Sequence, residues 1–238
     1  VFRIRKFAEG GALRMSIVER LAVYLREHRD EEQAGPMAAY MKNRFPFLGL
    51  KTPVRTALTR RFWQANGLPS PDAFRGAVRE LWALPEREFQ YAAMDLLQRR
   101  RKELDADDIG WLEELIVAKP WWDTVDLLAG HAVGGVLARH PEQMRGDAER
   151  WMDSGYLWLQ RTALLFQLRY KERTDARLLF AMIERCKGSK EFFIRKAIGW
   201  ALREYSKTDP DTVLRYVSKA GLSPLSEREA LKAIARKG

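Results

Sequence analysis

The sequence has 238 residues, 46% of them hydrophobic and 31% charged, which is long enough for a substantial core in one large or two small domains. No apolar run approaches the roughly 20 residues of a membrane helix, which excludes a membrane-spanning protein. The net charge of +10 attracts phosphates, but it is equally typical of a solvated, arginine-rich surface.

Helix-start signals organise the chain from residue 15 onward. Residues 1–14 show neither a signal-peptide core nor a helix cap, so we interpret 1–14 as a disordered or upstream extension and 15–238 as a single domain. Ser16 and Glu19 form a capping box, in which each side chain binds a main-chain amide of the first turn. Further helix starts are predicted at Thr52-Pro53, Ser70-Pro71 and Asp209-Pro210, and at a second capping box from Ser226 to Glu229.

Apolar residues recur with the period of a helix along most of the chain. One example is the set Phe89, Ala92, Ala93, Leu96 and Leu97. No stretch alternates with the period of two that is typical of a strand. The sequence therefore predicts an all-α fold of about thirteen helices.

Cysteine and histidine usage argues against redox and metal chemistry. The single cysteine, Cys186, lies in an apolar helical stretch and is expected to pack in the core. The three histidines, His28, His131 and His140, have no spacing that places two ligands on one helix face. We therefore predict no metal and no cofactor, and the single cysteine fits a cytoplasmic protein.

An internal repeat predicts the architecture. Similar five-residue segments begin at Phe89, Thr124, Leu159 and Ile194, each 35 residues after the one before. This period accommodates two helices and their turns, so we expect a HEAT-like or ARM-like α-solenoid of antiparallel helix pairs with a concave groove.

The repeat aligns four chemically active residues. Tyr91, Asp126, Arg161 and Lys196 occupy the same repeat position and are expected to form a row on one surface. Trp122 lies four residues before Asp126, and Trp200 lies four after Lys196, so each tryptophan shares a helix face with a member of the row. From the residues alone, a surface ion pair between Asp126 and Arg161 and core packing of the tryptophans remain the simpler interpretation.

Basic residues recur near the predicted helix ends. They are Arg99 to Lys102, then Arg169, Lys171 and Arg173, and then Arg203 and Lys207. Cations at helix C-termini also complement the helix dipole, which is the simpler explanation for any one of them. Their recurrence favours a phosphate-binding rim.

Several segments resemble the AlkD-type family of bacterial alkylpurine DNA glycosylases. The matching segments are residues 36–43 with 47–49, 79–82 with 84–90, 121–126, 158–161, and 190–194 with 198–200. The resemblance runs from about Ser16 to the C-terminus.

The resemblance implies a role for each of several residues. It implies the catalytic aspartate at Asp126, active-site tryptophans at Trp122 and Trp200, a DNA-contacting arginine at Arg161 and a groove tyrosine at Tyr40. We assign Lys196, with Arg161, to phosphates near the lesion. Five of the other tryptophans are assigned to the core, namely Trp63, Trp82, Trp111, Trp121 and Trp151.

The resemblance also implies an activity. It is hydrolysis of the N-glycosidic bond of cationic N3- and N7-alkylated purines, such as N3-methyladenine and N7-methylguanine, in duplex DNA. The expected enzyme is a monofunctional, monomeric, bacterial glycosylase that leaves an abasic site and associates with the nucleoid. Asp126 would stabilise the oxocarbenium-like sugar and position water. The indoles of Trp122 and Trp200 would hold the cationic nucleotide.

Two other functions remain open at this point. A non-catalytic binder of damaged or branched DNA would keep the basic rim without needing Asp126. A protein-binding HEAT scaffold would expose an apolar groove instead of a charged and aromatic row.

Overall fold

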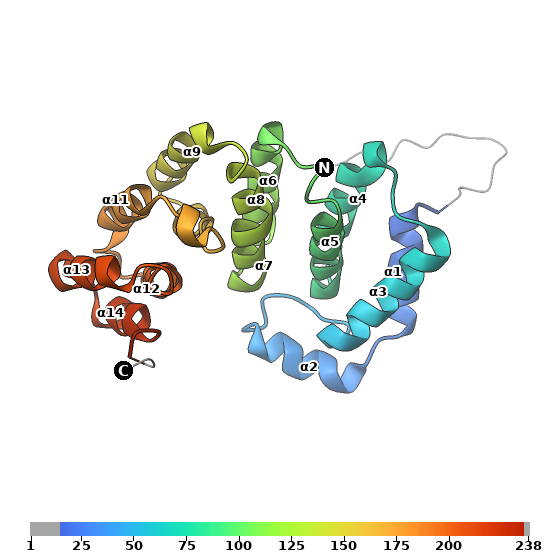
Figure 1. Cartoon of the computed structure of the whole chain (residues 1–238). Coiled ribbons are helices and arrows are strands. Elements are labelled where there is room, and N and C mark those ends of the chain that lie inside the picture. Colours follow the sequence, from blue (N-terminus) through green and yellow to red (C-terminus); the bar gives the residue numbers. More distant parts are fainter. Residues whose placement is uncertain (1–14, 236–238) are drawn as a thin grey trace. The chain divides into compact units, whose positions relative to one another are not determined.

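The computed structural model describes residues 15–235, which form helices and no strand (Figure 1). The helices are α1 (Ile17–Glu27), α2 (Glu31–Tyr40), α3 (Thr52–Asn66), α4 (Pro71–Ala83), α5 (Arg87–Arg99), α6 (Ile109–Ala118), α7 (Trp122–Leu127), α8 (Gly134–Leu137), α9 (Pro141–Asp153), α10 (Leu157–Leu165), α11 (Ala176–Cys186), α12 (Phe192–Tyr205), α13 (Pro210–Ala220) and α14 (Pro224–Leu231). The all-α prediction is confirmed. The prediction for residues 1–14 lies outside the described residues.

Three short helical segments complete the described range. Two are 3-10 helices, η1 (Ala106–Asp108) and η3 (Lys171–Arg173). The third, η2 (Leu128–Val133), is a π-helix that continues α7 directly and leads into α8. If α7, η2 and α8 are taken as one helix, the α-helical elements between residues 15 and 235 number thirteen, as the sequence predicted.

Three of the predicted helix starts are confirmed. The Glu19 amide donates to Ser16 Oγ at 3.0 Å and the Ser16 amide to Glu19 Oε2 at 2.6 Å, which completes the capping box. Ser70 and Asp209 cap α4 and α13 by accepting an amide hydrogen bond from the third helical residue.

Two predicted cap positions are displaced, by one residue at Thr52 and by three residues at Ser226. Thr52 is the first residue of α3, the cap position belongs to Lys51, and no side chain bonds the cap there. The helix α14 begins at Pro224, and Ser223 caps it by accepting from the amide of Ser226 at 3.2 Å. The earlier Ser-Pro pair therefore starts this helix, and Glu229 instead binds cations.

The chain divides into two compact units between Ala93 and Met94. In the first unit, α1 packs against α3 and α4. The loop after α2 is fixed by the buried Glu88 carboxylate, which accepts hydrogen bonds from the amides of Leu48, Gly49 and Leu50 at 2.9 to 3.1 Å. Burial raises the pKa of Glu88, although these bonds oppose the rise.

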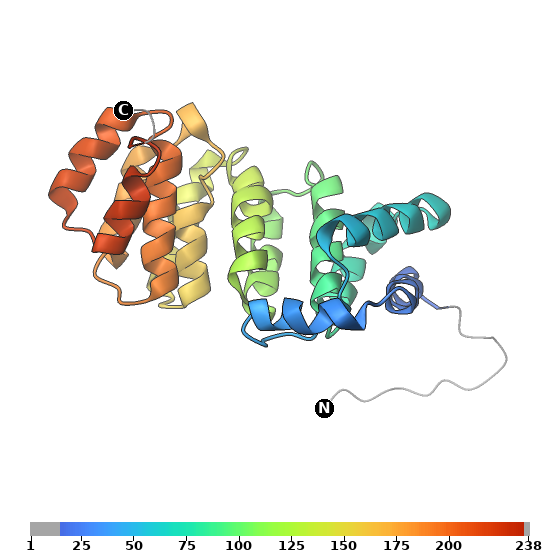
Figure 2. The same cartoon turned by 90° about the horizontal axis from the view of Figure 1, so that it is seen from below.

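The second unit is a stack of neighbouring helices. Figure 2 shows them side by side in chain order, from the green segment of α6 to α8 through α9 and α10 to the red α13 and α14. The helix α10 packs against α6, α7, α9 and α12, and α12 packs against α14. This arrangement is the one that stacked helical repeats produce.

The structure supports the repeat at the level of single residues. Tyr91, Asp126, Arg161 and Lys196 are each the fifth residue of a helix, of α5, α7, α10 and α12 respectively. A constant place in the helix explains the constant spacing of 35 residues.

The predicted core residues are buried. The five tryptophans assigned to the core, Trp63, Trp82, Trp111, Trp121 and Trp151, are at most 8% exposed. Cys186 is buried, its Sγ donates to the Met182 carbonyl, and burial raises its pKa to about 12, which suits packing. Within residues 15–235 no group of three or more metal-binding side chains gathers, and no helix is long and apolar enough to cross a membrane.

Candidate active site

Asp126 lies on the half-buried face of the short helix α7. Thr124 and Val125 are buried and fix this helix in the core, whereas Trp122 and Asp126, one turn apart, are half-buried. The predicted pairing of Trp122 with Asp126 on one helix face is therefore present.

Arg161 holds the Asp126 carboxylate in a two-point contact. Nε of Arg161 donates to Oδ1 at 2.7 Å, and Nη2 donates to Oδ2 at 2.9 Å. The side chains are 5% and 13% exposed, respectively. Because a guanidinium fork and a carboxylate match in geometry, this contact fixes the plane of the carboxylate as well as its position.

The third guanidinium nitrogen of Arg161 binds the main chain. Nη1 donates to the carbonyl of Phe193, in the first turn of α12. Each nitrogen of Arg161 is therefore engaged within the protein. This geometry favours Arg161 as the residue that positions Asp126, where the sequence predicted a DNA contact.

An aromatic cluster lies against this ion pair. The ring centroids of Trp121 and Phe193 are 5.0 Å apart, and Trp158 lies 5.0 Å from Phe193 and 5.6 Å from Trp121. The Arg161 guanidinium lies 5.7 Å from the Phe193 ring centroid. These rings exclude water from one side of the ion pair, which strengthens its electrostatic interactions.

The electrostatics of Asp126 reflect two opposing effects. Burial raises the pKa of this carboxyl, and the hydrogen bonds and charge of Arg161 oppose the rise, while the nearby Asp123 adds to it. Asp126 is thus a partly desolvated carboxylate held beside a permanent cation. Such a group acts more strongly on a developing positive charge than one in water.

Lys196 and Trp200 lie one turn apart on α12. Lys196 Nζ lies 2.9 Å from Glu229 Oε1, so it is paired with α14. Glu229 is 7% exposed and also binds Lys232 and Arg203. The structure therefore places Lys196 in a structural ion-pair network, whereas Trp200 is half-buried on the same helix.

Tyr40 and Tyr91 belong to the first unit. Tyr40 is the last residue of α2 and is 70% exposed. Tyr91 is half-buried, with the Arg55 guanidinium 4.8 Å from its ring centroid. The predicted role of Tyr40 in DNA binding stays a prediction.

Two features near Asp126 escaped the sequence analysis. The first is the Phe193 carbonyl. Phe193 lies in one of the segments that carry the family resemblance, but its carbonyl is a main-chain group that no side-chain pattern reveals. The second is His131, which lies in the π-helix that continues α7. Its Nε2 is 3.2 Å from Nη1 of Arg169.

A family model described as DNA alkylation repair enzyme matches residues 22–234. The chain belongs to this family. A solved structure described as a predicted DNA alkylation repair enzyme from Enterococcus faecalis is 33% identical, with a TM-score of 0.81, and the match covers 87% of this chain and 97% of that one. No match is found among curated proteins.

Membership of the DNA alkylation repair enzyme family supports a role in the repair of alkylated DNA. The resemblance that the sequence segments carried is thereby confirmed at the level of the family.

Proposed function

We propose that the protein is a monofunctional DNA glycosylase that hydrolyses the N-glycosidic bond of N3- and N7-alkylated purines in duplex DNA and leaves an abasic site. One observation carries the proposal. A partly buried carboxylate, Asp126, is held by a two-point contact from Arg161 in a chain of the DNA alkylation repair enzyme family.

The chemistry of the substrate explains why one carboxylate suffices. Alkylation at N3 or N7 makes the purine cationic, so the base leaves without a dedicated general acid. The positive charge then moves to the sugar, where an anion stabilises the oxocarbenium-like transition state. Asp126 is the anion in this proposal.

Asp126 also has the capacity to position water. A carboxylate has about four lone-pair sites, and Arg161 takes one on each oxygen of Asp126. The other sites are available to a water molecule or to the sugar. Because Arg161 is itself fixed to the Phe193 carbonyl, the carboxylate is preorganised and needs little reorientation during the reaction.

Trp122 and Trp200 are the proposed contacts for the cationic nucleotide. Indole faces bind cations more strongly than the other aromatic rings do. Both tryptophans are half-buried, on α7 and α12, so neither residue is fully enclosed in the core.

The ion pair of Lys196 supports the monofunctional assignment. A Schiff-base nucleophile requires a neutral amine. Lys196, the lysine of the aligned row, instead pairs with the Glu229 carboxylate, which favours its charged form. We therefore expect water, directed by Asp126, as the nucleophile.

The test is single-turnover excision of N7-methylguanine from a duplex by wild-type protein and by Asp126→Asn. We expect the variant to be about 10² to 10⁴-fold slower, the range for losing a well-placed electrostatic group. Asp211→Asn, at an exposed residue of α13, is the control and should retain the wild-type rate. A folded Asp126→Asn protein with the wild-type rate contradicts the proposal, and wild-type protein that binds DNA without excision favours a non-catalytic binder.

A further inference from the structure

The π-helix η2 determines which residues share a face with Asp126. In an α-helix the residue four positions later lies on the same face, and a π-turn inserts one further residue. The face that carries Trp122 and Asp126 is therefore continued by His131, five residues after Asp126. The burial pattern agrees, because His131 is half-buried while Ala129, Gly130 and Ala132 are buried.

His131 interacts with two arginines, one by direct contact and one through its charge. Arg169 Nη1 lies 3.2 Å from His131 Nε2, and the charge of Arg101 also acts on this imidazole. Both arginines are exposed. Burial lowers the pKa of His131, and the charges of Arg169 and Arg101 lower it further.

This basic cluster, Arg101, His131 and Arg169, has no carboxylate partner among residues 15–235. Some other arginines of the second unit pair with carboxylates. Arg150, for example, pairs with both Glu113 and Asp147. The exposed guanidinium groups of Arg101 and Arg169 thus carry positive charge that no carboxylate of residues 15–235 neutralises, which suits an anionic ligand.

A buried hydrogen bond fixes the segment that carries Arg169. The buried Tyr170 hydroxyl donates to the Gly134 carbonyl at 2.7 Å, which ties the segment carrying Arg169 to the end of the π-helix. Gly134 permits this approach, since a Cβ there would lie 2.2 Å from the Phe166 carbonyl oxygen. Arg169 and His131 are thus positioned by packing of the core.

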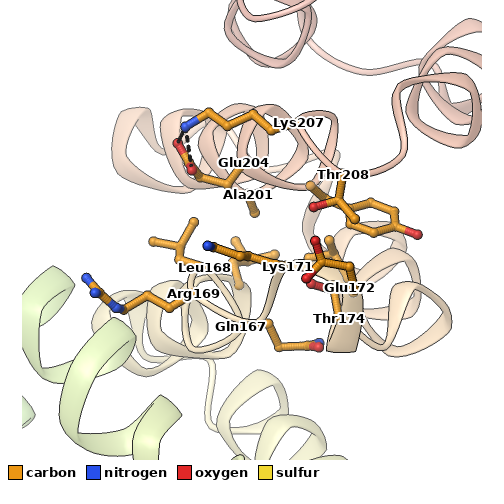
Figure 3. A pocket seen from close by; sticks show the side chains of 13 residues that line it. Gln167, Leu168, Arg169, Lys171, Glu172, Thr174, Ala201, Glu204, Lys207 and Thr208 are labelled. Atoms are coloured by element: carbon orange, nitrogen blue, oxygen red, sulfur yellow. Dashed lines mark hydrogen bonds and ion pairs between the residues drawn. The ribbon is translucent and has the colours of Figure 1, made fainter.

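Arg169 and its neighbours line a pocket of about 500 Å³. In Figure 3 the side-chain nitrogens of Arg169, Lys171 and Lys207 point toward the same side of the view. Lys207 is paired with Glu204, whereas Arg169 points out of the pocket toward the green helix. Lys171 has a φ of 53°, a left-handed conformation that is uncommon outside glycine and occurs at functional sites.

We propose that Arg101, His131 and Arg169 bind one backbone phosphate of the DNA strand on which Asp126 acts. The proposal rests on the proposed function and adds a phosphate site to it. Asp126 and His131 lie five residues apart on one continuous helical segment, so the bound phosphate is one close to the reacting sugar.

The chemistry of the basic cluster fits a phosphate diester. Guanidinium groups bind phosphate oxygens through paired N–H donors, and an imidazole contributes one or two more. A bound phosphate stabilises the protonated form of His131, so binding draws a proton to this residue.

The test compares two doubly substituted proteins of equal charge. The probe is a short fluorescent duplex that contains a tetrahydrofuran abasic analogue, and its affinity is measured against NaCl concentration. For Arg101→Ala with Arg169→Ala we expect the log-log salt slope to fall in magnitude by about 0.9, the value for one phosphate contact. The control is Arg177→Ala with Arg228→Ala, at exposed arginines of α11 and α14, which should keep the wild-type slope.

A second measurement needs no substitution. The sequence has three histidines, so the pKa of His131 can be followed by NMR with and without the same duplex, with His28 and His140 as internal references. We expect the pKa of His131 to rise on binding. An unchanged His131 pKa, or a salt slope that falls equally in both double variants, overturns the phosphate site.

The outcomes separate this proposal from the proposed function. Wild-type protein that excises N7-methylguanine through Asp126, while the Arg101 and Arg169 variant keeps the control's salt slope, overturns the phosphate site alone. A loss of slope together with a raised His131 pKa supports the site even where excision is absent.

Discussion

Asp126 and Arg161 occupy the same place in successive repeat units, 35 residues apart, and form a two-point ion pair at 2.7 and 2.9 Å. Each is the fifth residue of its helix, and α7 packs against α10. The repeat therefore brings a carboxylate and a guanidinium together by its register.

The first prediction separates positioning from DNA binding by Arg161. Lysine in its place keeps the charge but cannot make the paired contact. If Arg161 positions Asp126, Arg161→Lys should slow single-turnover excision of N7-methylguanine by about tenfold or more, as misplaced catalytic groups do. Duplex affinity should stay close to that of wild-type protein. A large loss of affinity with an unchanged rate at saturating protein would instead support a phosphate contact.

Much of the fold could be predicted because it depends on local signals. Ser16 and Glu19 define a helix start within four residues of sequence, and the helical period exposes the all-α class. The aligned row could also be predicted, since a constant repeat places Asp126 beside Arg161. An ion pair of Asp126 and Arg161 is the simpler interpretation from the residues alone, and this ion pair is present in the candidate site.

The remaining features depend on contacts that sequence patterns do not carry. The π-helix inserts one extra residue into the helical turn, and no sequence pattern marks the insertion. The place of His131 on the helix face of Asp126 therefore could not be predicted. The pairing of Lys196 with Glu229 could not be predicted either, because Glu229 lies 33 residues later on α14, and the assignment of Lys196 to phosphate stays a prediction. The Ser226 capping box is wrong because the helix already begins at Pro224, where Ser223 accepts from the Ser226 amide.

The second prediction concerns the close packing of the helix that contains Asp126. Gly134→Ala places a Cβ 2.2 Å from the Phe166 carbonyl oxygen, and main chain cannot yield cheaply. We expect the free energy of unfolding to fall by about 1–3 kcal/mol, as overpacking does. Gly135→Ala is the matched control, because a Cβ there meets nothing within 4 Å. It should leave stability unchanged or raise it by up to about 1 kcal/mol. Urea denaturation measures both.

The third prediction concerns the Glu229 network. The hydrogen bond from Lys232 and the charge of Lys196 lower the pKa of Glu229 from 4.5 to about 2. A carboxyl whose pKa is lower in the folded state stabilises the fold above its unfolded pKa and stops doing so as the pH falls through the folded value. Wild-type protein should therefore be more stable than Glu229→Gln at neutral pH. The difference should shrink between about pH 4.5 and pH 2. Denaturation of both proteins across this range decides the point, and a constant difference would contradict it.

The last prediction concerns the pH dependence of excision. Burial raises the pKa of Asp126 above the ordinary 3.8, even though Arg161 opposes the rise. The carboxylate acts as an anion in the proposed reaction, so the rate should fall as the pH is lowered through this raised value, and the acid limb should have a midpoint above pH 3.8. Asp126→Asn has no group to protonate there and should lack the limb.

This profile must be measured as a single-turnover rate with protein in saturating excess, because the protonation of His131 is expected to alter DNA affinity over a neighbouring range. Acid also releases alkylated purines without enzyme, so the rate for duplex alone is subtracted at each pH. Circular dichroism at each pH excludes unfolding, to which the Glu229 network contributes. An acid limb that Asp126→Asn shares with wild-type protein would assign the titration to another group and remove Asp126 from the chemical step.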